Sequence, residues 1–273
     1  MLIPPAFSCL SPVQARAAAL AELRLFLSRQ SGGPPTMAAR LPFGLAALDA
    51  HLPNGGLSCG ALHELVPATQ AALPAAFGFI VAVLARLSGN FLETATNKKI
   101  IVAMPRHGSR QCGRLSGHGL HSLGFDPRRV ILVETTQRHD NVWVLLEALH
   151  SGAPQAVVGM IDRLDLKTSQ KLHLAAVDAG LPLLLLRPSQ TLESSAAATR
   201  WRIGAVAAAR DRFGGYTRPR WRLQLERCRN GRPGEWVVEY DHVAHRFSLV
   251  TALADQTLSR GAGNQPRRQA SRS

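Results

Sequence analysis

The sequence is poor in the residues from which catalytic and metal sites are usually built. It has four cysteines among 273 residues, none at CxxC spacing, and 18 acidic residues against 32 lysines and arginines. Only 5% of its residues are aromatic. Scattered cysteines suit a reducing compartment and provide no disulfide or zinc framework. Because no Ser-His-Asp order, nucleophile elbow or dinucleotide fingerprint lies where a strand and a helix would support it, we expect no catalytic residues.

Long apolar runs are also scarce. The longest lies near residues 71–87 and is interrupted by Pro74 and Arg86. A membrane-spanning helix needs about 20 consecutive apolar residues, so we expect a buried helix here and no membrane segment. The opening MLIPPAFSCLSP has two early prolines and no basic leader, from which we expect no secretory signal and a cytoplasmic protein.

Positive charge is what the sequence has in excess. The formal net charge is +14 and the pI is about 11.1. Arginine carries most of this charge, and its planar guanidinium suits contacts with phosphates and carboxylates. The excess therefore indicates a nucleic acid or an acidic protein as a partner, with simple solubility as the alternative.

Composition divides the chain into three parts. Residues 13–30 place Leu20, Leu23 and Leu27 at helical spacing with arginines on other faces, which predicts an amphipathic helix. The SGGPP sequence at residues 31–35 predicts a linker, and the polar, basic C-terminus predicts disorder. The expected parts are an N-terminal helix and linker (1–40), a compact domain (41–255) and a basic tail (256–273).

In the central part, apolar runs rich in β-branched residues alternate with segments of helical spacing. This pattern predicts parallel strands joined by helices. After Pro188, polar and apolar residues alternate around an Asn230-Gly231 turn, which predicts an antiparallel hairpin region. The expected fold class is therefore α/β, with a mostly parallel sheet and this hairpin at its C-terminal end. The expected strands span residues 61–66, 99–104, 130–134, 156–161, 183–186, 201–207, 220–227 and 235–240, and the expected helices 77–87, 141–149 and 169–179.

The stretch GALHELVPATQAALPAAFGFIVAVL, residues 60–84, has the strand–loop–helix layout of a phosphate-binding loop. A working loop supplies glycine N–H groups, a lysine for the β and γ oxygens, and a hydroxyl for magnesium. Here Ala72 and Leu73 stand where the lysine and the serine or threonine would fall. We expect a degenerate nucleotide loop that holds no cofactor, formed by Pro67, Ala68, Thr69, Gln70, Ala71, Ala72 and Leu73.

Two groups of side chains suggest metal binding. One cysteine and three histidines fall within fifteen positions, but only His118 and His121 have a compact ligand spacing, and a short helix explains them as well. Asp162 and Asp165 follow the fourth predicted strand, where an NTPase holds magnesium. Without a lysine loop, N-capping of the next helix by Asp165 or Thr168 is the favoured interpretation. We therefore expect no metal site.

Arginine and tryptophan are interleaved in RWR at residues 200–202 and in RPRWR at residues 218–222. Such patches can hold phosphate and stack a base. On an alternating strand, however, Trp221, Leu223 and Leu225 share one face and the arginines share the other. This pattern favours tryptophans in the core and arginines on a solvated or partner-facing surface.

Several stretches resemble a RecA-like core. LPFGLAALDAHLPNGGLSCGALHELVP resembles its entry, LGFDPRRVILVE the approach to its third strand, and ATRWRIGAVAAARDRFGGYTRPRWRLQLERCRNGRPGEW its closing strands. Together, LPFG, GALHE and RPRWRLQLERCRNGRPGEW resemble the ImuA family, RecA-like and damage-inducible proteins of bacterial mutagenesis cassettes. The resemblance covers residues 41–250, nearly the whole part that we expect to fold.

The resemblance implies an accessory role in error-prone translesion DNA synthesis in the SOS response. The implied partners are an ImuB-type polymerase-like protein, an error-prone DNA polymerase and, as a further candidate, RecA. Met104-Pro105-Arg106 stands where RecA has its catalytic glutamate, which supports a non-catalytic adaptor. Two alternatives remain: a DNA-dependent ATPase with an unusual loop, and a direct DNA-binding repair protein.

Two surfaces are predicted to bind partners. The hairpin offers open backbone groups and arginines, so we expect it to contact the ImuB-type protein or the polymerase, with the N-terminal helix as the rival surface. The basic tail predicts weak, sequence-independent DNA binding. The predicted partner-binding residues are Arg218, Arg220, Trp221, Arg222, Arg227 and Arg229, and the predicted DNA-binding residues are Arg260, Arg267, Arg268 and Arg272.

Overall fold

The computed structural model of the protein describes residues 39–90, 98–108, 113, 115–187, 194–208, 213, 215 and 217–250. These residues contain one large sheet and one small sheet. The strands of the large sheet are β3 (Ala61–Pro67), β4 (Ile100–Pro105), β5 (Val130–Thr135), β6 (Ala156–Met160), β7 (Pro182–Leu186), β8 (Thr199–Val206), β9 (Arg220–Cys228), β10 (Gly234–Asp241) and β11 (Arg246–Leu249). The small sheet pairs β1 (Arg40–Leu41) with β2 (Leu57–Ser58).

The large sheet is parallel over most of its width. Its order is β11-β10-β9-β8-β3-β7-β6-β4-β5. The pairings from β8 through β5 are parallel, and β9, β10 and β11 extend the sheet in antiparallel fashion. The predicted α/β class, with a mostly parallel sheet and an antiparallel C-terminal region, is therefore confirmed and is compatible with a RecA-like core.

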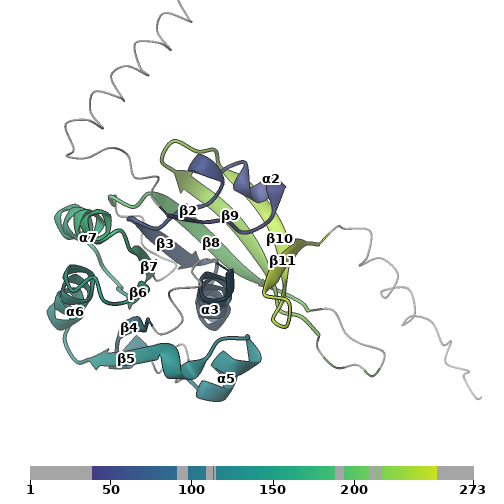
Figure 1. Ribbon diagram of the computed structural model, residues 1–273, viewed down its shortest axis with the longest axis horizontal. Helices are drawn as coiled ribbons and strands as arrows, with labels where there is room; N and C mark the ends of the chain where they lie inside the picture. Colours follow the sequence, from purple (N-terminus) through teal and green to yellow (C-terminus); the bar gives the residue numbers. More distant parts are fainter. Residues whose placement is uncertain are drawn as a thin grey trace, which may run out of the picture. The chain divides into compact units, whose positions relative to one another are not determined.

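Helices cover both faces of this sheet (Figure 1). Helices α6 and α7 lie on one face and contact β4, β6 and β3, while α3 lies on the other and contacts β3 and β8. The helices are α2 (Ala46–Asp49), α3 (Leu73–Asn90), α5 (Gly117–Ser122), α6 (Arg138–His150) and α7 (Leu166–Ala179), and the short 3-10 turns are η1 (Pro53–Gly55), η2 (Gln70–Ala72) and η3 (Pro127–Arg129).

Helix α7 shows how the sequence sets an element's limits. The Asp165 side chain accepts a hydrogen bond from the Thr168 amide at 3.1 Å, which caps the first turn. Gly180 ends the helix with a φ of 66°, in the left-handed region that glycine adopts readily. Asp165 thus has the capping role that the sequence favoured for it.

Helix α3 is the apolar centre of the fold. The window Gln70–Leu87 is long and apolar enough to cross a membrane, but 67% of it is buried inside the protein. Figure 1 shows β8–β11 curving around this helix. The rings of Trp221 and Phe247 each lie 5.7 Å from the Phe79 ring. The helix therefore packs as a core helix of the sheet, as the interrupted apolar run predicted.

The predicted N-terminal helix at residues 13–30 and the tail at residues 256–273 lie outside the described residues. The division of the chain into three parts therefore stays a prediction. Within the described part, each strand and helix that the sequence predicted is present, with ends that differ by a few residues. The sequence did not predict strand β11, the short strands β1 and β2, or helix α2.

Candidate functional site

The degenerate nucleotide loop lies between β3 and α3. Its first amide, from Ala68, donates to the Ile203 carbonyl of β8 at 2.7 Å, and the Ala72 amide donates to the Thr69 carbonyl at 3.0 Å. These two N–H groups are thereby engaged with the protein's own backbone. Ala72 and Leu73, where the lysine and hydroxyl would stand, are buried in the core. The loop keeps the strand-to-helix connection, with two of its amides bonded to the protein's own carbonyls and apolar side chains at positions 72 and 73.

A buried charge cluster lies on β3, three residues before this loop. The Glu64 side chain is fully buried, and its two oxygens accept from Arg187 Nη1 at 2.8 Å and from Arg200 Nε at 2.7 Å. The second guanidinium also donates to Ser195 Oγ at 3.4 Å. A buried carboxylate requires such compensation because its desolvation costs several kcal/mol. The cluster joins three adjacent strands, because Glu64 lies on β3, Arg187 follows β7 and Arg200 lies on β8. Both carboxylate oxygens of Glu64 are engaged within it.

His63, beside Glu64 in sequence, forms a separate buried network. Its Nε2 lies 2.9 Å from the Ser58 carbonyl, which can only accept, so Nε2 carries the proton. Its Nδ1 then accepts from the Thr199 hydroxyl at 2.8 Å, and that oxygen accepts from the Trp201 indole at 2.9 Å. Burial lowers the pKa of His63 to about 4. The imidazole is therefore neutral and fixed in one tautomer.

Two of the candidate metal ligands meet at the carboxyl ends of β4 and β6. His107 Nε2 lies 2.8 Å from Asp162 Oδ2, although 55 positions separate them in the sequence. The neighbouring parallel strands bring them together. Cys112 lies outside the described residues. Among the residues that the structure describes, no group of three His, Cys, Asp or Glu side chains is arranged to hold a metal ion.

Three of the predicted partner-binding arginines face the acidic side chains of β10. Two lie on β9, and Arg218 lies just before it. Arg220 Nε lies 2.7 Å from Glu239 Oε2, and these residues are direct cross-strand partners. Arg218 pairs with Asp241 at 2.6 Å, and Arg222 lies 3.6 Å from Glu235. We call this set the hairpin ladder: Arg218, Arg220 and Arg222 with Glu235, Glu239 and Asp241. Its outer part is exposed, with Arg222 and Glu235 more than half accessible.

The remaining members of the predicted partner surface have other positions. Arg227 donates to the Ser195 carbonyl at 2.9 Å, and Arg229 donates to the Ala196 carbonyl at 3.3 Å. Both arginines are therefore hydrogen-bonded to the segment before β8. Trp221 is 3% exposed, and its indole donates to the Ala75 carbonyl at 2.8 Å. The core interpretation of this tryptophan is confirmed, and the prediction that it contacts a partner is corrected. A ring that closes the core against α3 is not available to another protein.

The predicted DNA-binding residues of the tail, Arg260, Arg267, Arg268 and Arg272, lie outside the described residues. Their role stays a prediction. The Glu64 cluster was not predicted, although the sequence contains one signal for it. A glutamate in a strand that is apolar apart from the neighbouring His63, ALHELV, requires a cation beside it if the strand is buried.

Comparison with known proteins shows a clear relationship. The chain is similar to Protein ImuA of Caulobacter vibrioides, with 32% identity over 247 residues, which cover 83% of this chain and 95% of the relative. The identity and the coverage are the same for the proteins of two strains, NA1000 / CB15N and ATCC 19089 / CIP 103742 / CB 15. No family model matches the chain. The relationship therefore rests on near-full-length similarity.

Proposed function

The chain belongs to the ImuA family, and from this premise we propose that it is a non-catalytic accessory protein of error-prone translesion DNA synthesis. It would act in the SOS response to DNA damage, in the cytoplasm. Its proposed partners are an ImuB-type polymerase-like protein and an error-prone DNA polymerase, with RecA as a further partner. In this proposal the RecA-like core is an interaction platform.

The observation that carries the non-catalytic part is the state of the loop between β3 and α3. Phosphate binding at such a loop needs inward N–H donors, a lysine and a hydroxyl. The Ala68 and Ala72 amides donate to carbonyls, and positions 72 and 73 are buried apolar side chains. In addition, Met104 and Pro105 end β4, where the resemblance would place a catalytic glutamate. These features support binding of partners over turnover of ATP.

The hairpin ladder and the neighbouring sheet edge support the adaptor part. Strand β11 is an edge strand of the large sheet, and edge strands offer open backbone groups to another chain. Val243 and Leu249, at either end of this edge, are 79% and 40% exposed. Exposed apolar side chains bordered by polar groups are typical of protein interfaces, and arginine is enriched in them. We therefore place the partner contact at the ladder and the β10–β11 edge.

Co-expression of the chain with an ImuB-type protein tests this proposal. Purification through a tag on one protein, at about 150 mM salt, should recover both in a stable complex. The ladder variants described in the Discussion should lose the complex, whereas an exposed variant on α7, Lys171→Ala, should retain it. If the two proteins do not copurify under any order of tagging, the adaptor proposal fails.

A further inference from the structure

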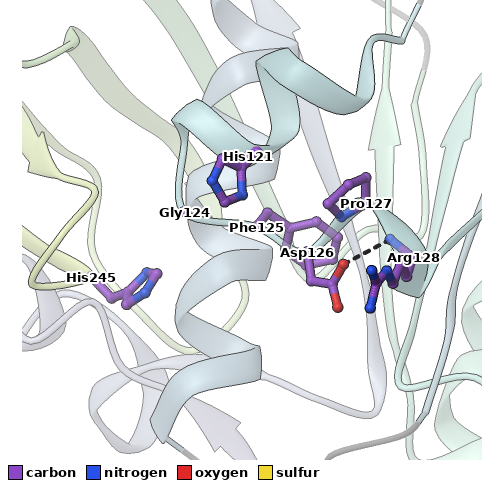
Figure 2. A pocket seen from close by; sticks show the side chains of 7 residues that line it. All are labelled: His121, Gly124, Phe125, Asp126, Pro127, Arg128 and His245. Atoms are coloured by element: carbon purple, nitrogen blue, oxygen red, sulfur yellow. Dashed lines mark hydrogen bonds between the residues drawn. The ribbon is translucent and has the colours of Figure 1, made fainter.

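A pocket separate from both the loop and the hairpin ladder lies between α5 and the turn that joins β10 to β11 (Figure 2). Its volume is about 610 Å³. Figure 2 shows His245 on one side and Asp126 and Arg128 on the other, with His121 from α5 above them. The lining residues are His121, Gly124, Phe125, Asp126, Pro127, Arg128 and His245. Two segments more than a hundred positions apart thus build one concave surface.

The pocket is held in shape by contacts behind it. Gly124 has a φ of 75°, and a Cβ there would lie 2.5 Å from the His242 carbonyl oxygen and 2.6 Å from His245 Cε1. Only glycine permits this approach of the two segments. The His245 carbonyl accepts a hydrogen bond from Arg86 Nη1 at 2.7 Å. The His245 ring nitrogen Nδ1 lies 3.2 Å from the Tyr240 hydroxyl. The histidine is therefore positioned by buried groups of the core.

Basic residues lie close to Arg128, which lines the pocket, and among the described residues none of them forms an ion pair with a carboxylate. Lys99 Nζ donates to the Arg128 carbonyl at 3.1 Å, and Arg129 donates to the Lys98 carbonyl at 3.2 Å. Arg129 also donates to the Gln155 side-chain oxygen, so the partners of these two cations are neutral oxygens. The one acid of the pocket, Asp126, accepts from the Arg128 amide at 2.9 Å. The arginines of the hairpin ladder differ, because each of them faces a carboxylate.

We propose that this pocket binds one nucleotide of a single-stranded DNA. Its volume lies in the range of roughly 300–1,000 Å³ that is usual for small-ligand sites. The flat rings of His121 and His245 offer surfaces on which a base can stack, and the Arg128 guanidinium suits a backbone phosphate. The phosphates of the neighbouring nucleotides would be attracted by Lys98, Lys99 and Arg129. A free mononucleotide has no such neighbours, so a strand should bind better.

An acidic peptide is the competing ligand for a basic surface. A carboxylate would use the cations but would leave the rings and most of the cavity without a partner. A nucleotide uses the cavity, the rings and the cations together, so the observations favour DNA. This inference does not rest on the proposed accessory role, because a pocket of this kind would bind a strand in any repair context.

The test measures binding of a fluorescent oligothymidylate of about 12 nucleotides to the full chain by anisotropy. The variants are Arg128→Ala and His121→Ala, whose side chains are exposed and whose removal should leave the fold intact. Arg163→Ala removes an exposed arginine after β6 and controls for the loss of one positive charge. A second oligonucleotide of equal length with abasic sites separates base stacking from phosphate binding without any variant.

We expect His121→Ala to weaken oligothymidylate binding about tenfold, and the abasic strand to bind the wild-type chain about tenfold more weakly than oligothymidylate. Arg128→Ala should lower the slope of log affinity against log salt by about 0.7, while Arg163→Ala changes neither quantity. Equal affinity for the abasic strand, or unchanged affinity after both pocket substitutions together, would overturn the proposal. A loss confined to the binding of a polyglutamate peptide would overturn it in favour of an acidic protein ligand.

Discussion

Glu64 and Arg187 form an ion pair of 2.8 Å inside the sheet, where their side chains are 0% and 1% exposed. Removal of the negative charge by Glu64→Gln would leave Arg187 and the neighbouring Arg200 facing a neutral amide. We expect this variant to lose about 3–5 kcal/mol of unfolding free energy, as for other broken buried pairs. Urea denaturation followed by circular dichroism measures the loss.

A matched control is Glu226→Gln, because Glu226 pairs with Arg202 where both side chains are about a quarter exposed. Solvent screening reduces the contribution of such a pair, so this variant should lose no more than about 1 kcal/mol. Equal losses in the two variants would show that burial does not set the contribution of the Glu64 cluster.

His63 predicts a pH dependence of stability. Its pKa falls from 6.5 to about 4 on burial, so the unfolded chain binds more protons than the folded chain between these values. The contribution is fully present above pH 6.5 and is lost as the pH falls towards 4, up to roughly 3 kcal/mol. Denaturation curves at pH 7, 5.5 and 4 should show a steeper decline for the wild type than for His63→Gln. Parallel declines in the two proteins would contradict this prediction.

The hairpin ladder predicts that partner binding depends on which strand carries the positive charge. Reversal of Arg218, Arg220 and Arg222 together would place new carboxylates opposite Glu235, Glu239 and Asp241 and would also strain the hairpin. The sharper test compares Arg222→Glu with the charge swap Arg222→Glu/Glu235→Arg. In the wild type, Arg222 and Glu235 lie 3.6 Å apart. The swap keeps an oppositely charged pair at these two positions, but the positive charge moves from β9 to β10.

We expect both of these variants to lose copurification with the ImuB-type protein, while the swap retains wild-type thermal stability. Restoration of binding by the swap would mean that the single variant acted through hairpin stability alone. Wild-type binding by both would move the partner surface away from the ladder, and the N-terminal helix would become the next candidate.

The loop between β3 and α3 predicts that ATP neither binds tightly nor is hydrolysed. Each missing charge-assisted contact to the phosphates or to magnesium removes about 1.5–3 kcal/mol. Titration calorimetry with ATP and magnesium should detect no binding in the micromolar range, and single-stranded DNA should stimulate no phosphate release. Micromolar affinity, or turnover that a substitution at residues 67–73 abolishes, would favour the DNA-dependent ATPase.

The tail predicts a second, weaker contribution to DNA binding. Deletion of residues 256–273 removes Arg260, Arg267, Arg268 and Arg272. If they contact duplex phosphates, the slope of log affinity against log salt should fall by about 0.9 for each lost contact. An unchanged slope after the deletion would show that the tail does not touch the phosphates.

Much of the fold could be predicted because burial leaves a strong pattern in this sequence. Runs such as Val157–Met160 and Leu183–Leu186 are apolar on both faces, which identifies central parallel strands. Helix α3 begins at Leu73, four residues before the predicted start, because Pro74 is tolerated in the first helical turn. Strand β11 was missed because it is four residues long and its side chains, apart from Phe247, are exposed.

The site was less predictable because its contacts join distant residues. The sequence places Arg187 and Glu64 123 positions apart, and only the order of the strands brings them together. The same holds for His107 with Asp162 and for the ladder, where the β9–β10 register decides which acid faces which arginine. The pocket likewise depends on the approach of Gly124 to the β10–β11 turn, which no local pattern reveals.

The continuity of the large sheet has a mechanical consequence. Strand β11 connects to β3 through four successive strand pairings, by way of β10, β9 and β8. A partner that binds the β10–β11 edge would therefore be connected to the core through the backbone hydrogen bonds between strands, and not through the connecting loops. A rotation imposed on this edge would be transmitted to the central strand β3, so a partner bound at the edge would keep a fixed orientation relative to the core.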